Sequence, residues 1–145
     1  MQTFLPYPSI DKSAECLDYK RLGKQRVEAW QIYCALTNSD YGWQNHPAVK
    51  MWRGYEYLLI EYGMMMSHEW FLRGYNGTIM EQRFDTEFAK FKNDYGFKLP
   101  EKPFWWGDDA FHASHRSNLL RKNPEYYSQF GWTEPDNLPY VWPVK

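Results

Sequence analysis

The sequence predicts an all-α fold: a compact single-domain helical bundle over residues 1–145 with an extended, proline-containing C-terminal tail. Apolar side chains recur at three- or four-residue steps along most of the chain, and no segment alternates in the manner of a strand. Gly, Pro, Asn and Asp residues bound the periodic segments. With 145 residues, of which 43% are hydrophobic and 24% charged, the chain is long enough to bury the core of one domain.

The first 40 residues predict two helices. Residues 11–17 are expected to form a short helix, and the run from Tyr19 to Gly23 is expected to interrupt the helical pattern. A second helix is predicted from about residue 22 to 36, where Asn38-Ser39-Asp40 follows as a stop signal. Its apolar positions fall on one side of a helix: Leu22, Ala29, Trp30, Tyr33 and Leu36.

A long central helix is predicted over residues 47–73. Pro47 suits the first helical position, and Gly74 suits the residue after the last. Gly54 and Gly63 each weaken a helix interior, so we expect a kink or a close helix crossing at these two positions. The stripe expected to face the core comprises Met51, Tyr55, Leu58, Leu59, Tyr62, Met65, Met66 and Trp70.

The second half of the chain predicts two more helices and a loop. Thr78 and Glu81 fit a capping box at the start of one helix, along which Phe84, Phe88, Phe91 and Tyr95 follow before Gly96 ends it. Pro100, Pro103 and Gly107 then predict a loop that packs Phe104, Trp105 and Trp106 on the body. The last helix is expected to begin after Asp108 or Asp109 and to stop before Pro124. The tail contains Pro135, Pro139 and Pro143.

The charges are balanced in number but not in position. There are 17 Lys and Arg against 18 Asp and Glu, yet residues 12–53 carry seven basic and four acidic side chains, and residues 111–122 carry three basic and none acidic. A fold that joins these two segments would have a positive face able to attract anions, although a network of surface ion pairs would explain the same pattern. No apolar run is long enough for a membrane span, and two cysteines provide no disulfide framework, so a cytoplasmic protein is expected, nucleoid-associated when it binds DNA.

The basic run over residues 20–28 is the first candidate site. Helical spacing puts Arg21, Gln25 and Glu28 on one stripe, with Lys24 beside them. Neighbouring cations would hold Glu28 ionised, ready to stabilise a developing cation or to remove a proton, while the other cations bind phosphates. An ordinary surface pairing network is the alternative.

A second candidate segment covers residues 46–55. Arg53, which lies between Trp52 and Tyr55, is suited to stack on a nucleotide or to hydrogen-bond with it, and His46 precedes it at the start of the helix. Aromatic side chains at helical spacing are also typical of a protein core.

The third candidate segment covers residues 111–127. His112, His115 and Arg116 share a helix face, and the small Ser and Ala side chains around them would allow the close approach of a backbone, which favours phosphate contacts. Because no third ligand is placed beside the two histidines, neither a metal nor any other cofactor is expected. Tyr126 and Tyr127 are candidates for base stacking or, equally, for the core.

Four segments together resemble one known family. They are Met1-Gln2-Thr3-Phe4-Leu5-Pro6, the run from Arg21 to Glu28, the segment from Trp70 to Tyr75 that ends in Arg73-Gly74-Tyr75, and Lys122-Asn123-Pro124-Glu125-Tyr126-Tyr127. In this order they resemble the pyrimidine-dimer DNA glycosylases, and the resemblance implies a compact all-helical monomer that acts on damaged double-stranded DNA without a metal. The type enzyme attacks the sugar with the amine of its first residue and is assisted by a glutamate. An α-amine suits this role, because its unperturbed pKa near 8 leaves about a tenth of it neutral at pH 7.

Carried onto this sequence, the resemblance assigns the amine to Met1 and the assisting carboxylate to Glu28, with Arg26 as its neighbour; Glu15 and Asp18 are the alternatives. Val27 separates Arg26 from Glu28, whereas the type enzyme has Arg and Glu adjacent. Gln2 is bulky, so Met1 is expected to be retained. The residues expected to contact DNA are Gln2, Thr3, Arg21, Lys24, Gln25, His46, Arg53, His112, His115, Arg116, Arg121, Lys122, Tyr126 and Tyr127.

The function expected from these observations is a DNA repair glycosylase with associated AP-lyase activity, which excises a damaged pyrimidine through an imine. Two alternatives remain open. One is a non-catalytic DNA-binding protein on the same scaffold, and the other is an enzyme of modified-nucleotide metabolism.

Overall fold

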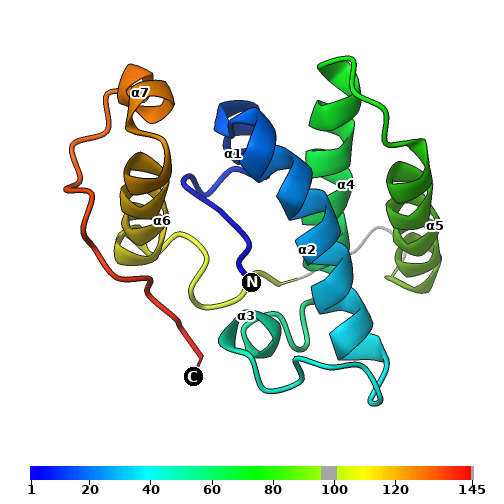
Figure 1. The fold of residues 1–145 in the computed structure, drawn as a ribbon. Helices are drawn as coiled ribbons and strands as arrows, with labels where there is room; N and C mark the ends of the chain where they lie inside the picture. The colour runs from blue at the N-terminus through cyan, green and yellow to red at the C-terminus, as the bar shows by residue number, and fades with distance from the viewer. Residues whose placement is uncertain (96–100, 145) are drawn as a thin grey trace.

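A computed structural model describes residues 1–95 and 101–144 and confirms the all-α prediction, since this part of the chain contains helices and no strand (Figure 1). Gly96 and Pro100, which were expected to end a helix and to break the chain, lie outside the described residues. The elements are α1 (Ile10–Cys16), α2 (Tyr19–Thr37), α3 (Pro47–Lys50), α4 (Glu56–Leu72), α5 (Thr78–Tyr95), α6 (Asp109–Lys122), α7 (Pro124–Tyr127) and a 3-10 turn, η1 (Ser128–Phe130).

The first helix forms as predicted, but the second begins earlier than expected. Ser9 caps α1 by accepting a hydrogen bond from the backbone N–H of Lys12 at 3.2 Å. α2 starts at Tyr19, so the run from Tyr19 to Gly23 is its first turn and not an interruption. Gly23 lies where α2 meets the ring of Trp70, whose nearest atom would be 3.0 Å from an added Cβ. The glycine therefore serves a close contact within a continuous helix.

The predicted central helix is two helices. α3 ends at Lys50 and α4 begins at Glu56, because Gly54 has a φ of +90°, a left-handed conformation that an α-helix cannot contain. The prediction of a close crossing at Gly63 is confirmed. A Cβ at this position would lie 2.1 Å from the ring of Phe84, so α4 and α5 pack together at a point where only glycine fits.

The last helix and the tail match their predictions. Asp108 caps α6 by accepting from the backbone N–H of Ala110 at 3.3 Å, and α6 ends before Pro124. In the preceding loop Trp105 is buried, whereas Phe104 is 77% exposed and does not pack on the body as expected. No helix forms from Gly131 to Val144, and this tail runs alongside α6 (Figure 1).

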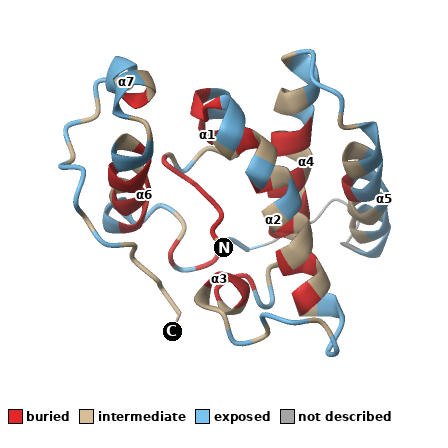
Figure 2. Cartoon of the chain, in the orientation of Figure 1, coloured by how far each residue is buried: buried red, intermediate tan, exposed pale blue. Residues whose placement is uncertain are grey.

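An extended amino-terminal segment, residues 2–6, passes through the interior of the molecule. All five residues are buried (Figure 2). The segment lies between α6 on one side and α2 with α4 on the other, and it hydrogen-bonds to side chains of all three helices (Figure 1). The amino terminus is therefore positioned by the core itself.

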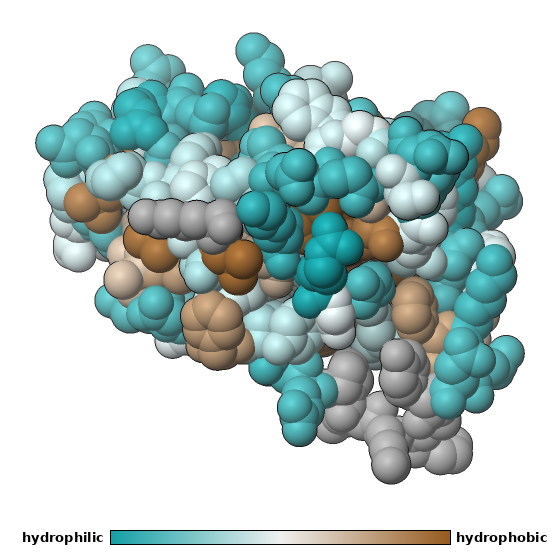
Figure 3. Space-filling model, turned by 90° about the horizontal axis from the view of Figure 1, so that it is seen from below, coloured by the Kyte–Doolittle hydropathy of each residue, from teal (hydrophilic) through white to brown (hydrophobic). Residues whose placement is uncertain are grey.

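The surface seen from below carries mostly hydrophilic residues, and the hydrophobic ones form small separate patches (Figure 3). Within the described residues, no helix is both long and apolar enough to cross a bilayer.

Candidate functional site

A hollow of about 740 Å³ opens beside the amino terminus. Its wall comes from the N-terminal segment, the first half of α2, the end of α4, the end of α6 and the tail. The lining residues are Met1, Gln2, Phe4, Tyr19, Lys20, Arg21, Gly23, Lys24, Gln25, Arg26, Glu28, Trp70, Lys122 and Tyr140. Elements from both ends of the chain meet here, so the basic segments that the charge pattern singled out do lie together.

Glu28 is fixed beside the amino terminus. Its Oε2 accepts from the backbone N–H of Gln2 at 3.4 Å and from Nε2 of Gln25 at 3.1 Å. Since the nitrogens of adjacent residues are at most about 3.7 Å apart, the α-nitrogen of Met1 lies within about 7 Å of the same oxygen. An amine and a carboxylate thus share one hollow, as expected for Met1 and Glu28.

The two alternative carboxylates do not line this hollow. Glu15 lies on α1 beside a different, smaller hollow. Asp18 is buried, binds Nη1 of Arg21 at 3.1 Å and contacts the hydroxyl of Tyr127. Val27, which separates Arg26 from Glu28, is 41% exposed, and its presence leaves both Arg26 and Glu28 on the wall of the hollow.

Five basic side chains make the hollow electropositive. They are Lys20, Arg21, Lys24, Arg26 and Lys122. Partial burial lowers the pKa of Lys122 below its ordinary value, and repulsion from Arg21, Lys24 and Arg121 lowers it further. Lys122 at the end of α6 therefore adds its positive charge to that of α2, although the two helices are far apart in the sequence.

An aromatic cluster forms one side of the hollow, and the sequence did not identify it as part of a site. The guanidinium of Arg26 lies 4.3 Å from the centre of the Trp70 ring, a cation–π contact. Tyr19 stacks on Trp70 at 5.5 Å and is 55% exposed, and Tyr75 packs against both rings. Helical spacing had placed Trp70 in the core. Tyr19, which stacks on Trp70, directly precedes the basic run in the sequence, and this position could have identified it as part of the site.

The prediction that His112 and His115 contact phosphate was wrong, because both are buried at 1% and 0% exposure. Nδ1 of His112 lies 2.7 Å from the carbonyl oxygen of Leu5, and Nδ1 of His115 accepts from the Leu5 N–H at 2.8 Å. Their shared helix face points at the amino-terminal segment and not at solvent.

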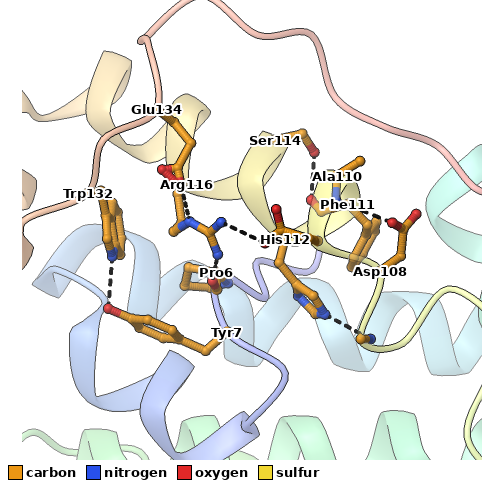
Figure 4. A network of polar contacts seen from close by, with 12 residues as sticks. Pro6, Tyr7, Asp108, Ala110, Phe111, His112, Ser114, Arg116, Trp132 and Glu134 are labelled. Carbon is orange, nitrogen blue, oxygen red and sulfur yellow. Dashed lines mark hydrogen bonds and ion pairs between the residues drawn. The ribbon is translucent and has the colours of Figure 1, made fainter.

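The side chains of Arg116 and Thr3 also make contacts within the protein. Arg116 binds Glu134 and donates to the carbonyl oxygen of Pro6 at 2.8 Å (Figure 4). It also pairs with Asp109. Thr3 is fully buried and accepts from Nε1 of Trp52 at 3.0 Å. These positions do not fit the expected DNA contacts. Gln2 is 5% exposed, but it keeps its place on the wall of the hollow.

Of the two candidate stacking tyrosines, Tyr127 belongs to the core. It is 0% exposed and its hydroxyl accepts from the backbone N–H of Asp18 at 2.9 Å, which ties α7 to the start of α2. Tyr126 is half-buried and packs on Tyr127. Neither lines the hollow, so the core alternative describes Tyr127.

The remaining candidates lie around or away from the hollow. Arg121 binds Asn118 and the carbonyl oxygen of Asp136. Arg53 lines a separate hollow with Glu56. His46 caps α3. Burial lowers its pKa, the positive α-amine lowers it further, and the negative charge of Glu28 acts in the opposite direction.

The described residues contain no cluster of three His, Cys, Asp or Glu side chains able to hold a metal ion. The groups that the hollow does offer are cations, an amine, one carboxylate and stacked aromatic rings.

Fold and site together define an all-helical protein whose electropositive hollow brings an amino terminus and a glutamate together. A family model described as pyrimidine dimer DNA glycosylase matches residues 1–81, more than half of the chain and the whole of α1 to α4. The chain belongs to this family. No curated protein and no solved structure matches it.

Proposed function

We propose that this protein is a DNA glycosylase with associated AP-lyase activity, which uses the α-amine of Met1 as nucleophile and Glu28 as the assisting carboxylate. Membership of a family of DNA glycosylases makes it an enzyme of DNA repair with DNA as substrate. The observation that carries the finer proposal is the carboxylate of Glu28, 3.4 Å from the nitrogen of Gln2 and in the same hollow as Met1.

The electropositive wall supports binding of a nucleic acid. Lys24 and Lys122 are exposed and lie on the wall, where they would contact the phosphates that flank the target nucleotide. The hollow has about 740 Å³, within the range of roughly 300–1,000 Å³ that takes small ligands. A nucleotide turned out of the duplex therefore fits, and the amine reaches a sugar carbon only when the nucleotide is extruded.

In the first chemical step the neutral amine forms a bond to C1′ of the damaged nucleotide, and the bond from C1′ to the base breaks. The base leaves with the electron pair and takes up a proton, which the amine has lost. The lone pair of the nitrogen that is now bonded to C1′ then opens the sugar ring. The C1′–O4′ bond breaks, O4′ takes a proton from water, and a protonated imine remains. The negative charge of Glu28 stabilises this cation, and its oxygens can relay the proton from water to O4′.

The lyase step follows from the same imine. Removal of a proton from C2′ sends its electron pair toward the imine, and the bond from C3′ to the phosphate oxygen breaks with elimination of the phosphate. Water then adds to the imine carbon and restores the free amine. Glu28 is again the carboxylate on the wall of the hollow that can accept the C2′ proton.

Reduction with borohydride tests the proposal. The protein is incubated with ultraviolet-irradiated duplex, with duplex containing an abasic site, and with intact duplex as control. We expect a covalent protein–DNA adduct with the first two, because borohydride delivers hydride to the imine carbon. Salt-sensitive binding to all three without an adduct would instead favour a DNA-binding protein that lacks the chemistry.

Mass spectrometry of the adduct identifies the nucleophile. The sugar remnant is expected on the α-nitrogen of Met1. Loss of Met1 would make the nitrogen of Gln2 the amine, and this atom already contacts Glu28. A remnant on a lysine side chain would exclude both.

A further inference from the structure

The amino-terminal segment is held by side chains at five successive backbone groups. Two of these side chains belong to α2 and α4. Gln25 Oε1 accepts from the Phe4 N–H at 2.9 Å, and the Tyr62 hydroxyl lies 2.8 Å from the Phe4 carbonyl oxygen. The other three come from α6. There His115 accepts from the Leu5 N–H, His112 contacts the Leu5 carbonyl, and Arg116 donates to the Pro6 carbonyl.

The two histidines must be neutral and must be opposite tautomers. His115 accepts through Nδ1, so its proton is on Nε2. Nδ1 of His112 faces the Leu5 carbonyl, and its Nε2 accepts from the Gly107 N–H at 3.0 Å, so its proton is on Nδ1. Burial favours this state, since it lowers the pKa of both rings, that of His115 to about 3.

Leu5 is the only residue of the segment whose N–H and C=O can satisfy this pair without displacing the amino terminus. A slip of one residue in one direction would bring Pro6 to His115, and proline has no N–H to donate. A slip in the other direction would bring Phe4 there and move Gln2 about 3.3 Å along the segment, away from Glu28. The pair therefore fixes a single register.

We propose that His112 and His115 are positioning residues, which fix the register of the amino-terminal segment and so hold the α-amine beside Glu28. Neither histidine lines the hollow, and both act through Leu5. The catalytic part of this inference rests on the proposed function, whereas the structural part can be measured without it. The alternative is that the histidines only fill the core.

His112→Asn and His112→Gln form a matched pair that separates the two roles. The Asn amide can replace Nδ1 and donate to the Leu5 carbonyl, but it leaves the Gly107 N–H without its acceptor. The Gln amide can replace Nε2 and accept from Gly107, but it leaves the Leu5 carbonyl without its donor. Each variant loses one hydrogen bond, so their free energies of unfolding should be similar.

We expect His112→Asn to form the borohydride adduct on abasic duplex at close to the native rate. His112→Gln should lose on the order of a hundredfold in the rate at saturating DNA, because a shift of about 1 Å in a reacting group has this effect, while its affinity for the duplex stays the same. Where the native protein forms the adduct, equal rates for the two variants would overturn the proposal, as would a loss of rate that follows the loss of stability.

Hydrogen exchange at the amides of residues 3–5 provides a readout independent of activity. Faster exchange in His112→Gln than in His112→Asn supports the positioning role even if the native protein forms no adduct and the proposed function fails. Equal exchange overturns it. Should His112→Gln not fold, His115→Asn, whose amide oxygen can accept from the Leu5 N–H, is compared with His115→Leu, which offers no acceptor; only the latter should expose the segment.

Discussion

The peptide nitrogen of Gln2 and Oε2 of Glu28 are 3.4 Å apart, although 26 residues separate them in the chain. Gln25 donates to the same oxygen from one helical turn earlier. The carboxylate is thus held by its own helix and by the amino-terminal segment together. The negative charge of Glu28 therefore lies at a defined distance from any group that extends from Gln2 into the hollow.

Replacement of the assisting carboxylate tests this relationship directly. Glu28→Gln keeps the shape of the side chain and removes its charge, so we expect turnover and adduct formation to fall by a factor of about 100 or more while binding to DNA survives. Rates and affinities are measured on the same abasic duplex. Glu15→Gln on α1, outside the hollow, is the control, and a Glu28→Gln variant with native turnover would remove Glu28 from the site.

The cation at the end of α6 should contribute to binding of any DNA sequence. Lys122→Gln is expected to weaken binding to damaged and intact duplex alike, and to reduce the slope of log affinity against log salt concentration by about 0.9, because one phosphate contact is lost. Binding is measured between low and moderate salt. Lys90→Gln on α5, where the lysine is exposed and pairs with Glu87, should keep the native slope. An unchanged slope for Lys122→Gln would place this residue outside the interface.

Acid should destabilise the fold through His115. The folded-state pKa of about 3 is below the ordinary value of 6.5, so the unfolded chain binds the proton more readily. The neutral His115 ring therefore stabilises the fold fully above pH 6.5. As the pH falls from there toward 3, the free energy of unfolding decreases by about 1.4 kcal/mol for each pH unit. Between pH 8 and pH 5 the free energy of unfolding should drop by about 2 kcal/mol on this account. Urea unfolding at each pH measures the drop, and His115→Asn, which does not titrate, should reduce it.

The crossing of α4 and α5 should tolerate no side chain at position 63. Gly63→Ala adds a Cβ that would lie 2.1 Å from the Phe84 ring, so we expect a loss of about 1–3 kcal/mol in the free energy of unfolding, although Ala is the better helix former. Gly42→Ala, with nothing within 4 Å, is the matched control. Urea unfolding of both variants checks this, and equal stability would mean that the helices separate without cost.

Local signals in the sequence predicted those elements whose ends are set by a single residue. Asp108 and Pro124 bound α6 in both the prediction and the structure, because a capping side chain and a proline act within one turn. The break between α3 and α4 was missed, since the apolar period continues from Met51 to Leu58 and does not report the backbone angle of Gly54.

The sequence placed Glu28 among the basic residues of α2, and these side chains do line one hollow, while their roles stay predictions. The predicted phosphate contacts of His112 and His115 were wrong, because helical spacing shows that two side chains share a face but not what covers that face. The small residues beside them do admit a backbone, as the sequence suggested. The backbone that approaches them belongs to the protein itself and not to DNA. Ser117 accepts from the Leu138 N–H at 3.0 Å, and Leu5 lies against both histidines.

The pairing of Leu5 with His115 spans 110 residues. During translation the amino-terminal segment is made before α1 to α5, and α6 is made after them, so this pairing cannot form until α6 has been synthesised. Such distant contacts slow folding, and until α6 is made the backbone groups of Leu5 lack their histidine partners. The order of translation therefore makes closure of the core a late step, and the same step completes the hollow.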